Sequence, residues 1–410
     1  MQAQLCDEST SERLIIALEP ECAALFVREQ RDEHPNPALL ATHYAVVDCG
    51  GGTVDIAYHC VEKKKDGSMA IKELAPPSGG PYGGTLVDGA LELLLDKIFG
   101  VGFCEKLKWR YGDVWMKLMS ELEHAKSGLD GKKDDDKLYF ELSMRFGEAC
   151  ETLVEKSATS LLKACTDPMV GYSHGKMTIN AKLMKTWYDS AIEQICEGLN
   201  KNLQRRGAQM ISAIYMVGTF SSSRYLLQGI RKGIHNIQKE NIINPAESTV
   251  AIVHGAVIYG FNPSIVQERV SAMSYGVQIQ EDFDPARHPI ESRVYLAGTP
   301  RCMKVYSEFV KKDETLRSPD IRVQHYTAPT DTTTEVLVTI FCAPKAVKLI
   351  DDPECMQLAT ILVKMPDITG GKKRAITVSM IFGGPEIHVV AKDNTTGKAF
   401  DTVVDFDHKK

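Results

Sequence analysis

Residues 48 to 55 are Asp48-Cys49-Gly50-Gly51-Gly52-Thr53-Val54-Asp55, and they lie between two segments that alternate like β-strands. Three consecutive glycines let the backbone approach a ligand closely and turn successive N–H groups inward, which forms a concave site for an anion. Thr53 can add a hydroxyl donor, and Asp48 can hold a magnesium-bound water. The stretch therefore predicts a loop that binds a terminal phosphate. A hairpin that needs only the backbone freedom of glycine is the alternative.

The segments around this loop predict a β-meander. Downstream, Asp66-Gly67 marks a hairpin turn into a return strand near Met69 to Leu74. Upstream, the apolar run Leu14 to Leu18 predicts a buried strand, and Glu19-Pro20-Glu21 predicts a helix with proline in its first turn.

The next part of the chain is predicted to be mainly helical. Residues from about Val87 to Gly207 have helical periodicity, interrupted by a charged loop from Asp130 to Asp136, and they end in an amphipathic stretch from Ala181 to Leu203. A strand from Ile211 to Val217 and a helix from Gly218 to Gly233 follow. Strands and helices in this order predict an α/β fold.

After Phe261-Asn262-Pro263 the pattern changes to short segments rich in Val, Ile and Thr. Turn sequences such as Gly383-Gly384-Pro385 and Asn394-Thr395-Thr396-Gly397 separate them. Short strands at this spacing predict an all-β, sandwich-like domain.

A second motif, Tyr215-Met216-Val217-Gly218-Thr219-Phe220-Ser221-Ser222-Ser223-Arg224, is an apolar strand that breaks at glycine into a helix. A helix that starts after a small-residue turn offers free N–H groups and room for a flat ligand such as a nucleoside. Any strand-turn-helix crossover has the same pattern, so a purely structural role is an equally good interpretation.

Two further features lie between these motifs. Gly79-Gly80-Pro81-Tyr82-Gly83-Gly84-Thr85 predicts a tight turn whose backbone, at Gly83 and Gly84, can contact a ribose or phosphate. Glu123 and Lys126 are three residues apart on a predicted helix, so they share a face from which they can reach sugar hydroxyls and a base. An ordinary solvated ion pair is the alternative for these two residues.

Composition narrows the class of protein. The chain has 410 residues, 54 acidic against 48 basic side chains and a formal charge of −6, without a basic tract, so nucleic acid is not expected as a partner. The 11 cysteines are scattered and never form Cys-x-x-Cys, so neither disulfides nor a metal site is expected. No apolar segment is long enough for membrane insertion, and the N-terminus Met1-Gln2-Ala3-Gln4-Leu5-Cys6-Asp7-Glu8 lacks the features of a signal peptide. A cytoplasmic location is expected.

The order of these motifs resembles the actin-like ATPase superfamily, and most closely the divergent branch of the 70-kDa heat-shock family that comprises the proteins 12A and 12B. In that family a sequence like Asp48 to Asp55 is the second phosphate loop. Glu19 corresponds to the glutamate that faces magnesium and the attacking water, and Gly83 and Gly84 lie in the ribose-side turn. Gly218 and Thr219 correspond to the adenosine motif, in which Thr219 replaces a glycine.

The resemblance implies a domain organisation. It assigns 1–43 to the remnant of a first ATPase lobe, 44–262 to the second lobe with a helical insert at 83–180, 263–275 to a linker and 276–410 to a β-rich domain like the family's substrate-binding domain. The first phosphate loop and the lysine assigned to catalysis are not found in this sequence. We therefore expect an N-terminally truncated family member that is at most a weak ATPase.

The resemblance also implies a function. We expect a non-classical heat-shock-70-like protein that binds ATP or ADP, with Mg²⁺ held through water, and that engages proteins or extended peptides as a chaperone or scaffold in a stress response. Its catalytic residues would be Glu19 and Asp48. Its nucleotide-binding residues would be Gly50, Gly51, Gly52, Thr53, Gly83, Gly84, Glu123, Lys126, Gly218 and Thr219. A phosphotransferase of the sugar-kinase type and a nucleotide-free structural interaction protein are the alternatives.

Overall fold

The computed structural model describes residues 14–29, 41–296 and 298–405. The N-terminal segment from Met1 to Glu8, on which the absence of a signal peptide was predicted, lies outside the described residues. The chain divides into two compact units. We call Glu19–Ala57 with Ser78–Ile258 the mixed unit, and Met1–Leu18, Tyr58–Pro77 and Tyr259–Lys410 the β unit. No helix in the described ranges is long and apolar enough to span a bilayer.

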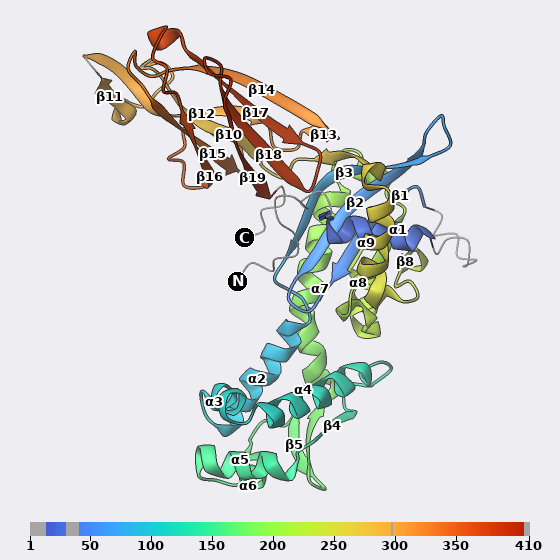
Figure 1. The fold of residues 1–410 in the computed structure, drawn as a ribbon. Helices are drawn as coiled ribbons and strands as arrows, with labels where there is room; N and C mark the ends of the chain where they lie inside the picture. Colours follow the sequence, from blue (N-terminus) through green and yellow to red (C-terminus); the bar gives the residue numbers. More distant parts are fainter. Residues whose placement is uncertain (1–13, 30–40, 297, 406–410) are drawn as a thin grey trace. The chain divides into compact units, whose positions relative to one another are not determined.

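The mixed unit contains a sheet in which β1, β7 and β8 pair in parallel, together with most of the helices (Figure 1). Its helices are α1 (Glu19–Glu29), α2 (Thr85–Phe99), α3 (Phe103–Arg110), α4 (Gly112–Ser127), α5 (Met144–Val154), α6 (Ala158–Ala164), α7 (Ala181–Leu203), α8 (Arg224–Gly233) and α9 (Ala251–Phe261). Its strands are β1 (His43–Cys49), β4 (Lys137–Glu141), β5 (Val170–Ser173), β6 (Lys176–Asn180), β7 (Ala213–Val217) and β8 (Ile242–Ile243). Strands β2 (Val54–Lys63) and β3 (Met69–Gly80) contribute residues to each unit.

The main sheet of the mixed unit is built on β1. This strand is buried from Tyr44 onward and pairs in parallel with β7, with Asp48 opposite Val217, and β7 pairs in parallel with β8. Near-continuous burial explains why β7, and β1 from Tyr44 to Val47, are apolar rather than alternating. The carboxyl ends of β1 and β7 therefore lie side by side, at the positions where the two glycine motifs begin.

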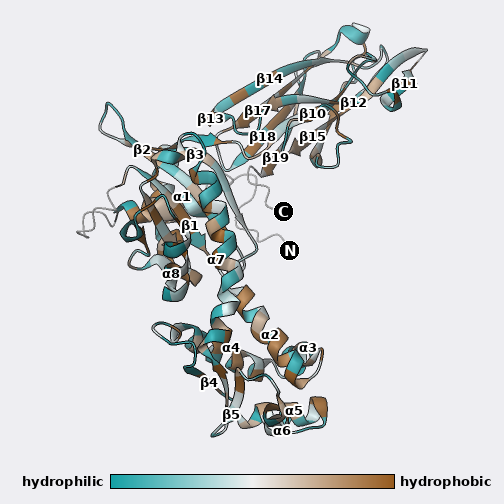
Figure 2. Cartoon of the chain, turned by 180° about the vertical axis from the view of Figure 1, so that it is seen from behind, coloured by the Kyte–Doolittle hydropathy of each residue, from teal (hydrophilic) through white to brown (hydrophobic). Residues whose placement is uncertain are grey.

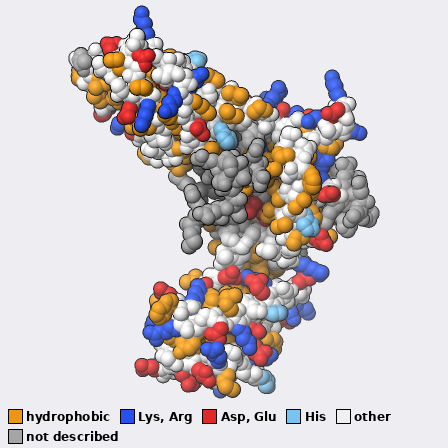
Figure 3. All heavy atoms as spheres, in the orientation of Figure 1, with side chains coloured by type: hydrophobic (Ala, Val, Ile, Leu, Met, Phe, Trp, Pro, Cys, Tyr) orange, Lys and Arg blue, Asp and Glu red, His pale blue; other side chains and the backbone are white. Residues whose placement is uncertain are grey.

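Helix α7 spans the residues that its amphipathic pattern predicted. Its buried face repeats at helical spacing, through Met184, Tyr188, Ala191, Ile195 and Leu199. Hydrophobic residues occur along α2 and along strands of the β unit such as β17 and β18 (Figure 2). Helices α2 to α6 gather with a small sheet of order β4-β6-β5 at the far end of α7 (Figure 1). On the face shown in Figure 3, acidic and basic side chains are interspersed over this helical part.

Two sequence predictions for this region were incomplete. Residues Val87 to Gly207 were expected to be mostly helical, but they include the small sheet, whose strands are only four or five residues long. The run Leu14 to Leu18 was expected to be a buried strand, but it has no regular structure. Leu14, Ile15 and Ile16 are 47%, 49% and 42% exposed. A strand needs a neighbouring strand for its backbone hydrogen bonds, and no described residue pairs with this run.

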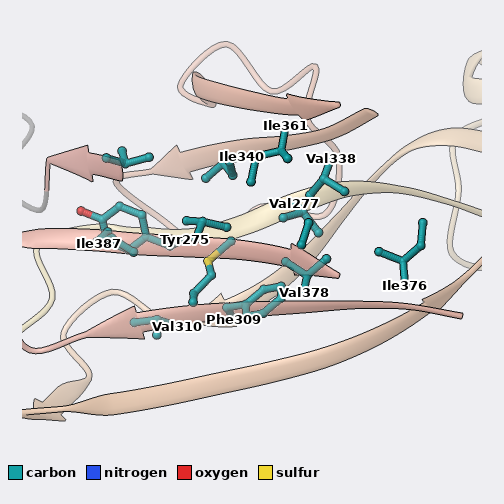
Figure 4. Packing of buried hydrophobic residues seen from close by; sticks show 14 of the residues in the cluster. Tyr275, Val277, Phe309, Val310, Val338, Ile340, Ile361, Ile376, Val378 and Ile387 are labelled. Carbon is teal, nitrogen blue, oxygen red and sulfur yellow. The ribbon is translucent and has the colours of Figure 1, made fainter. Parts of the chain in front are cut away.

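The β unit consists almost entirely of strands. They are β9 (Val266–Val270), β10 (Ser274–Asp282), β11 (Arg293–Leu296), β12 (Thr299–Val310), β13 (Thr315–Arg317), β14 (Asp320–Thr327), β15 (Glu335–Ala343), β16 (Met356–Lys364), β17 (Ala375–Phe382), β18 (Glu386–Asp393) and β19 (Ala399–Asp405). One antiparallel sheet has the order β11-β12-β10-β15-β16 and another the order β14-β17-β18-β19. Their facing sides share one apolar core, to which Val277 and Ile340 of the first sheet and Val378 and Ile387 of the second contribute (Figure 4).

The segment predicted as a linker contains β9. This strand pairs in parallel with β3 and in antiparallel register with β13, with Leu316 opposite Arg269. Arg269 is 1% exposed and donates a hydrogen bond to the carbonyl of Gly383, between β17 and β18. The segment predicted as a linker therefore contains a strand with a partner on both sides.

Candidate functional site

The glycine loop between β1 and β2 is held by a second glycine turn. The N–H of Gly50 donates to Thr53 O at 3.0 Å, and the carbonyls of Gly50 and Gly51 accept from Gly84 N (3.1 Å) and Thr85 N (2.8 Å). A Cβ at Gly83 would lie 2.6 Å from Gly51 O, so the two turns can approach this closely only with glycine at position 83. The predicted turn at Gly83 and Gly84 therefore holds the side of the glycine loop on which the carbonyls of Gly50 and Gly51 lie.

The opposite side of the glycine loop is open. Gly51, Gly52 and Thr53 are exposed, and a Cβ added at Gly51 or Gly52 would meet nothing within 4 Å. Among the described residues, the N–H groups of Gly51 and Gly52 have no hydrogen-bond acceptor. Two such donors at one concave turn suit an anionic group such as a phosphate.

Buried carboxylates flank the loop. Asp48, at the end of β1, and Asp55, at the start of β2, are each 4% exposed, and the Thr53 hydroxyl donates to Asp55 Oδ2 at 3.4 Å. Gly218 follows β7 with a φ of +84°, and a Cβ there would lie 2.5 Å from Cys49 O and would also clash with the Asp48 carboxylate. The predicted residues Asp48 and Gly218 are therefore in contact, and only glycine fits beside this carboxylate.

A cavity of about 610 Å³ opens beside the glycine loop in the mixed unit. It is lined by residues from the loop, α2, α4, α7, and the start of α8. These are Gly51, Gly84, Asp88, Glu123, Lys126, Ser127, Gly128, Asp130, Tyr188, Thr219, Phe220, Ser222, Ser223, Arg224 and Tyr225. The structure thus brings together Gly51, Gly84, Glu123, Lys126 and Thr219, which were predicted from separate motifs.

Other predicted site residues do not line the cavity. Gly50, Gly52, Thr53, Gly83, Asp48 and Gly218 belong to the turns next to it. Glu19 is the first residue of α1, is exposed and is not part of the lining, whereas its neighbour Glu21 is buried. The described residues therefore give no structural support for Glu19 in this cavity.

Lys126 is held by two carboxylates. Its Nζ lies 2.5 Å from Asp88 Oδ1 and 2.6 Å from Glu123 Oε1. The Lys126 side chain is 11% exposed, against 28% for Asp88 and 67% for Glu123. The ion pair that was the alternative interpretation of Glu123 and Lys126 is present. Asp88 on α2 forms a second ion pair with Lys126. Sequence analysis missed Asp88, although its place in the first turn of α2 favours an acidic residue.

Aromatic side chains, also missed from the sequence, form one wall. Tyr188 stacks on Phe220 with ring centroids 5.5 Å apart, and it meets Tyr225 edge-on at 5.5 Å. Burial raises the pKa of Tyr188 to about 12, so its hydroxyl stays protonated at neutral pH. A Cβ at Gly84 would lie 3.3 Å from the Phe220 ring, which packs the second turn against this wall. The aromatic wall offers an apolar side to a flat ligand.

A second ion pair joins α8 to the loop after α4. Arg224 Nη1 lies 3.0 Å from Asp130 Oδ2, and the Ser223 hydroxyl accepts from Leu226 N to cap α8. Arg224 is 76% exposed, so this pair adds little to stability but places a guanidinium at the cavity. In the part of the chain that the structure describes, no group of three or more His, Cys, Asp or Glu is arranged to bind a metal ion directly. Asp48 and Asp55 suit an ion held through water.

No family model matches this chain. It is similar to heat shock 70 kDa protein 12A of Mus musculus, at 27% identity over 99% of this chain and 67% of that protein. Heat shock 70 kDa protein 12A of Homo sapiens is 26% identical over 99% of this chain and 67% of that protein. Heat shock 70 kDa protein 12B of Homo sapiens is 25% identical over 98% of this chain and 67% of that protein. The mixed α/β architecture fits the actin-like ATPase fold that this similarity implies.

The predicted resemblance is therefore confirmed: along nearly its whole length, this chain is similar to the 12A and 12B proteins of the 70-kDa heat-shock family.

Proposed function

We propose that this chain is a non-classical heat-shock-70-like protein that binds ATP or ADP in the cavity beside the glycine loop. The observation that supports the proposal is the composition of that cavity. Gly51, Gly84, Glu123 and Thr219 come from four separate motifs, each of which suggested a contact with nucleotide, and all of them line one space. A volume of about 610 Å³ is ample for a nucleoside diphosphate.

In the proposed complex the phosphates lie at the glycine loop. The open N–H groups of Gly51 and Gly52 and the hydroxyl of Thr53 would donate to phosphate oxygens. Asp48 would orient a water bound to Mg²⁺, which neutralises phosphate charge when it is present. The backbone around Gly50, Gly83 and Gly218 would stabilise the conformation of the glycine loop without contacting the ligand.

The nucleoside would occupy the rest of the cavity. Glu123 and Lys126 lie where they can bond ribose hydroxyls, and Thr219 and the aromatic wall flank the space for the base. In this proposal the mixed unit corresponds to the second lobe of the ATPase fold. The β unit, with two antiparallel sheets around one core, corresponds to the family's substrate-binding domain and would engage proteins or extended peptides.

Calorimetric titration with MgADP and MgATP tests the nucleotide site. The wild-type chain should bind, and ligand at a hundredfold excess over Kd should stabilise the mixed unit by about 2.7 kcal/mol. Gly51→Val places a branched side chain in the open face of the loop, where a Cβ clashes with nothing, so the variant should fold and lose binding. Gly89→Val is the matched control, because Gly89 lies in open space on α2 and outside the cavity.

Two outcomes would contradict the proposal. The first is a wild-type chain that gives neither heat nor a thermal shift with millimolar nucleotide, which would favour a nucleotide-free interaction protein. The second is a Gly51→Val variant that binds as well as the Gly89→Val control, which would place the nucleotide elsewhere.

A further inference from the structure

The ion pairs around Lys126 determine the charge of one part of the cavity lining. Asp88 and Glu123 both bond the Lys126 ammonium, and Asp130 pairs with Arg224. The cavity lining contains three carboxylates and two cationic side chains, which leaves one negative charge in excess. The excess lies at the Asp88–Lys126–Glu123 cluster, because the pair of Asp130 and Arg224 is neutral.

The less exposed carboxylate of this cluster is Asp88. It is 28% exposed, against 67% for Glu123, and it reaches Lys126 from a different helix. Lys126 with Glu123 alone would be a neutral pair, with two ammonium N–H groups left for a ligand. With Asp88 present, one N–H remains and the cluster is negative. Asp88 therefore converts a site that would accept an anion into one that repels it.

The glycine loop, in another part of the lining, attracts anions. Gly51 lines the cavity and its N–H group is open, as is that of Gly52 next to it. A ligand that matches both the glycine loop and the negative cluster has an anionic group for the loop and a neutral, hydroxyl-bearing body beside the cluster. This asymmetry orients the nucleotide with its phosphates at the glycine loop.

Resting on the proposed function, we infer that Asp88 makes this site selective for nucleotides whose ribose 2′- and 3′-hydroxyls carry no phosphate. ADP fits, because its sugar is neutral and offers hydroxyls to Glu123 and Lys126. A ribose-phosphorylated analogue would place a second anion against the negative cluster. The phosphate and the negative cluster would lie a few ångström apart, at an effective dielectric constant of about 20. Their repulsion should raise the Kd of the analogue by about tenfold or more relative to ADP.

The test compares the binding of ADP and of ADP phosphorylated on its ribose 3′-hydroxyl to the full chain by calorimetry. Wild type should bind ADP at least about tenfold more tightly than the analogue. Asp88→Asn should reduce that ratio, because the cluster becomes neutral and Lys126 is freed. Lys126→Met should raise it, because two carboxylates then face the phosphate. Glu92→Gln is the matched control: Glu92 lies on α2, pairs with Lys108 at 2.7 Å and is outside the cavity, so the ratio should not change.

Opposite shifts in the two variants would support the inference, since a merely structural role would not move the ratio in opposite directions. Equal wild-type affinity for the two nucleotides would overturn the inference and leave the proposed function standing. If Asp88→Asn and Lys126→Met both left the ratio of the two Kd values unchanged, the inference would also be overturned and the proposed function would stand. A wild-type chain that binds neither nucleotide would overturn the proposed function and the inference together.

Discussion

Gly218 offers a direct test of how the site is assembled. Its φ of +84° lies in the left-handed region, and a Cβ there would lie 2.5 Å from Cys49 O and 2.8 Å from Cys49 C, in addition to clashing with Asp48. In Gly218→Ala the left-handed conformation costs about 1–2 kcal/mol, and crowding in a packed site costs about 1–3 kcal/mol more. The mixed unit should therefore lose about 2–5 kcal/mol of unfolding free energy.

Gly102→Ala separates the two contributions. Gly102 has a similar φ of +79°, belongs to the same unit, and has nothing within 4 Å of an added Cβ. It should lose only the conformational part, about 1–2 kcal/mol. The difference between the two variants is the cost of the close approach of Gly218 to β1.

Tryptophan fluorescence during urea unfolding is the assay. The three tryptophans, Trp109, Trp115 and Trp187, all belong to the mixed unit, so the signal is specific to it. An equal loss of stability in Gly218→Ala and Gly102→Ala would refute the argument that glycine is required by the contact with β1. Retention of full stability in Gly218→Ala would refute the left-handed backbone as well.

Three further predictions concern other buried contacts. Arg374→Lys should destabilise the β unit by at least about 3 kcal/mol, measured by circular dichroism in urea, because lysine cannot replace a buried guanidinium that bonds several backbone carbonyls. Those carbonyls belong to Thr330, Asp331, Thr333, Met365, Asp367 and Gly371. Burial, aided by Arg269, lowers the pKa of His59 from 6.5 to about 3, so below pH 6.5 only the unfolded chain binds this proton. The free energy of unfolding should therefore fall by about 1.4 kcal/mol for each pH unit from 6.5 toward 3. In acid unfolding, the His59→Gln variant should not show this dependence of unfolding free energy on pH. Gly255→Ala should separate α9 from α1, because its Cβ would lie 2.8 Å from Cys22 Cα, and should lower the urea midpoint of the tryptophan signal.

The sequence predicted the elements whose patterns are local and long. The amphipathic period of α7 extends over 23 residues, and its bounds agree with the predicted Ala181 to Leu203. The hairpin at Asp66-Gly67 also occurs where it was predicted, and so does the strand-turn-helix unit at Gly218, except that its α-helix begins at Arg224 rather than at Gly218. Each of these depends on residues that are neighbours in the chain, so a periodic pattern or a turn sequence is sufficient.

Elements that depend on distant partners were missed. Strand β4 alternates buried and exposed residues over Lys137–Glu141, but five residues among helices give too weak a pattern. Asp88 and Tyr188 reach the cavity only because α2 and α7 pack against the turns that carry the motifs, and no sequence spacing encodes that contact. The same reasoning applies to Leu14 to Leu18, whose apolar run predicts a strand but cannot show whether a partner strand is available.

Strand β9 changes how the β unit can be studied. A fragment of residues 264–410 would contain the segment predicted as a linker and the whole β-rich domain, and so could be considered for a test of peptide binding alone. In the structure β9 depends on β3 as a neighbour, and the N–H of Val270 donates to Glu73 Oε2 at 2.7 Å. Both β3 and Glu73 lie before that fragment, so separating it would remove one side of β9 and leave a buried N–H without its acceptor, at a cost of about 1–3 kcal/mol. A fragment that failed to bind peptides would then report on its own folding, and peptide capture by the β unit has to be measured on the whole chain.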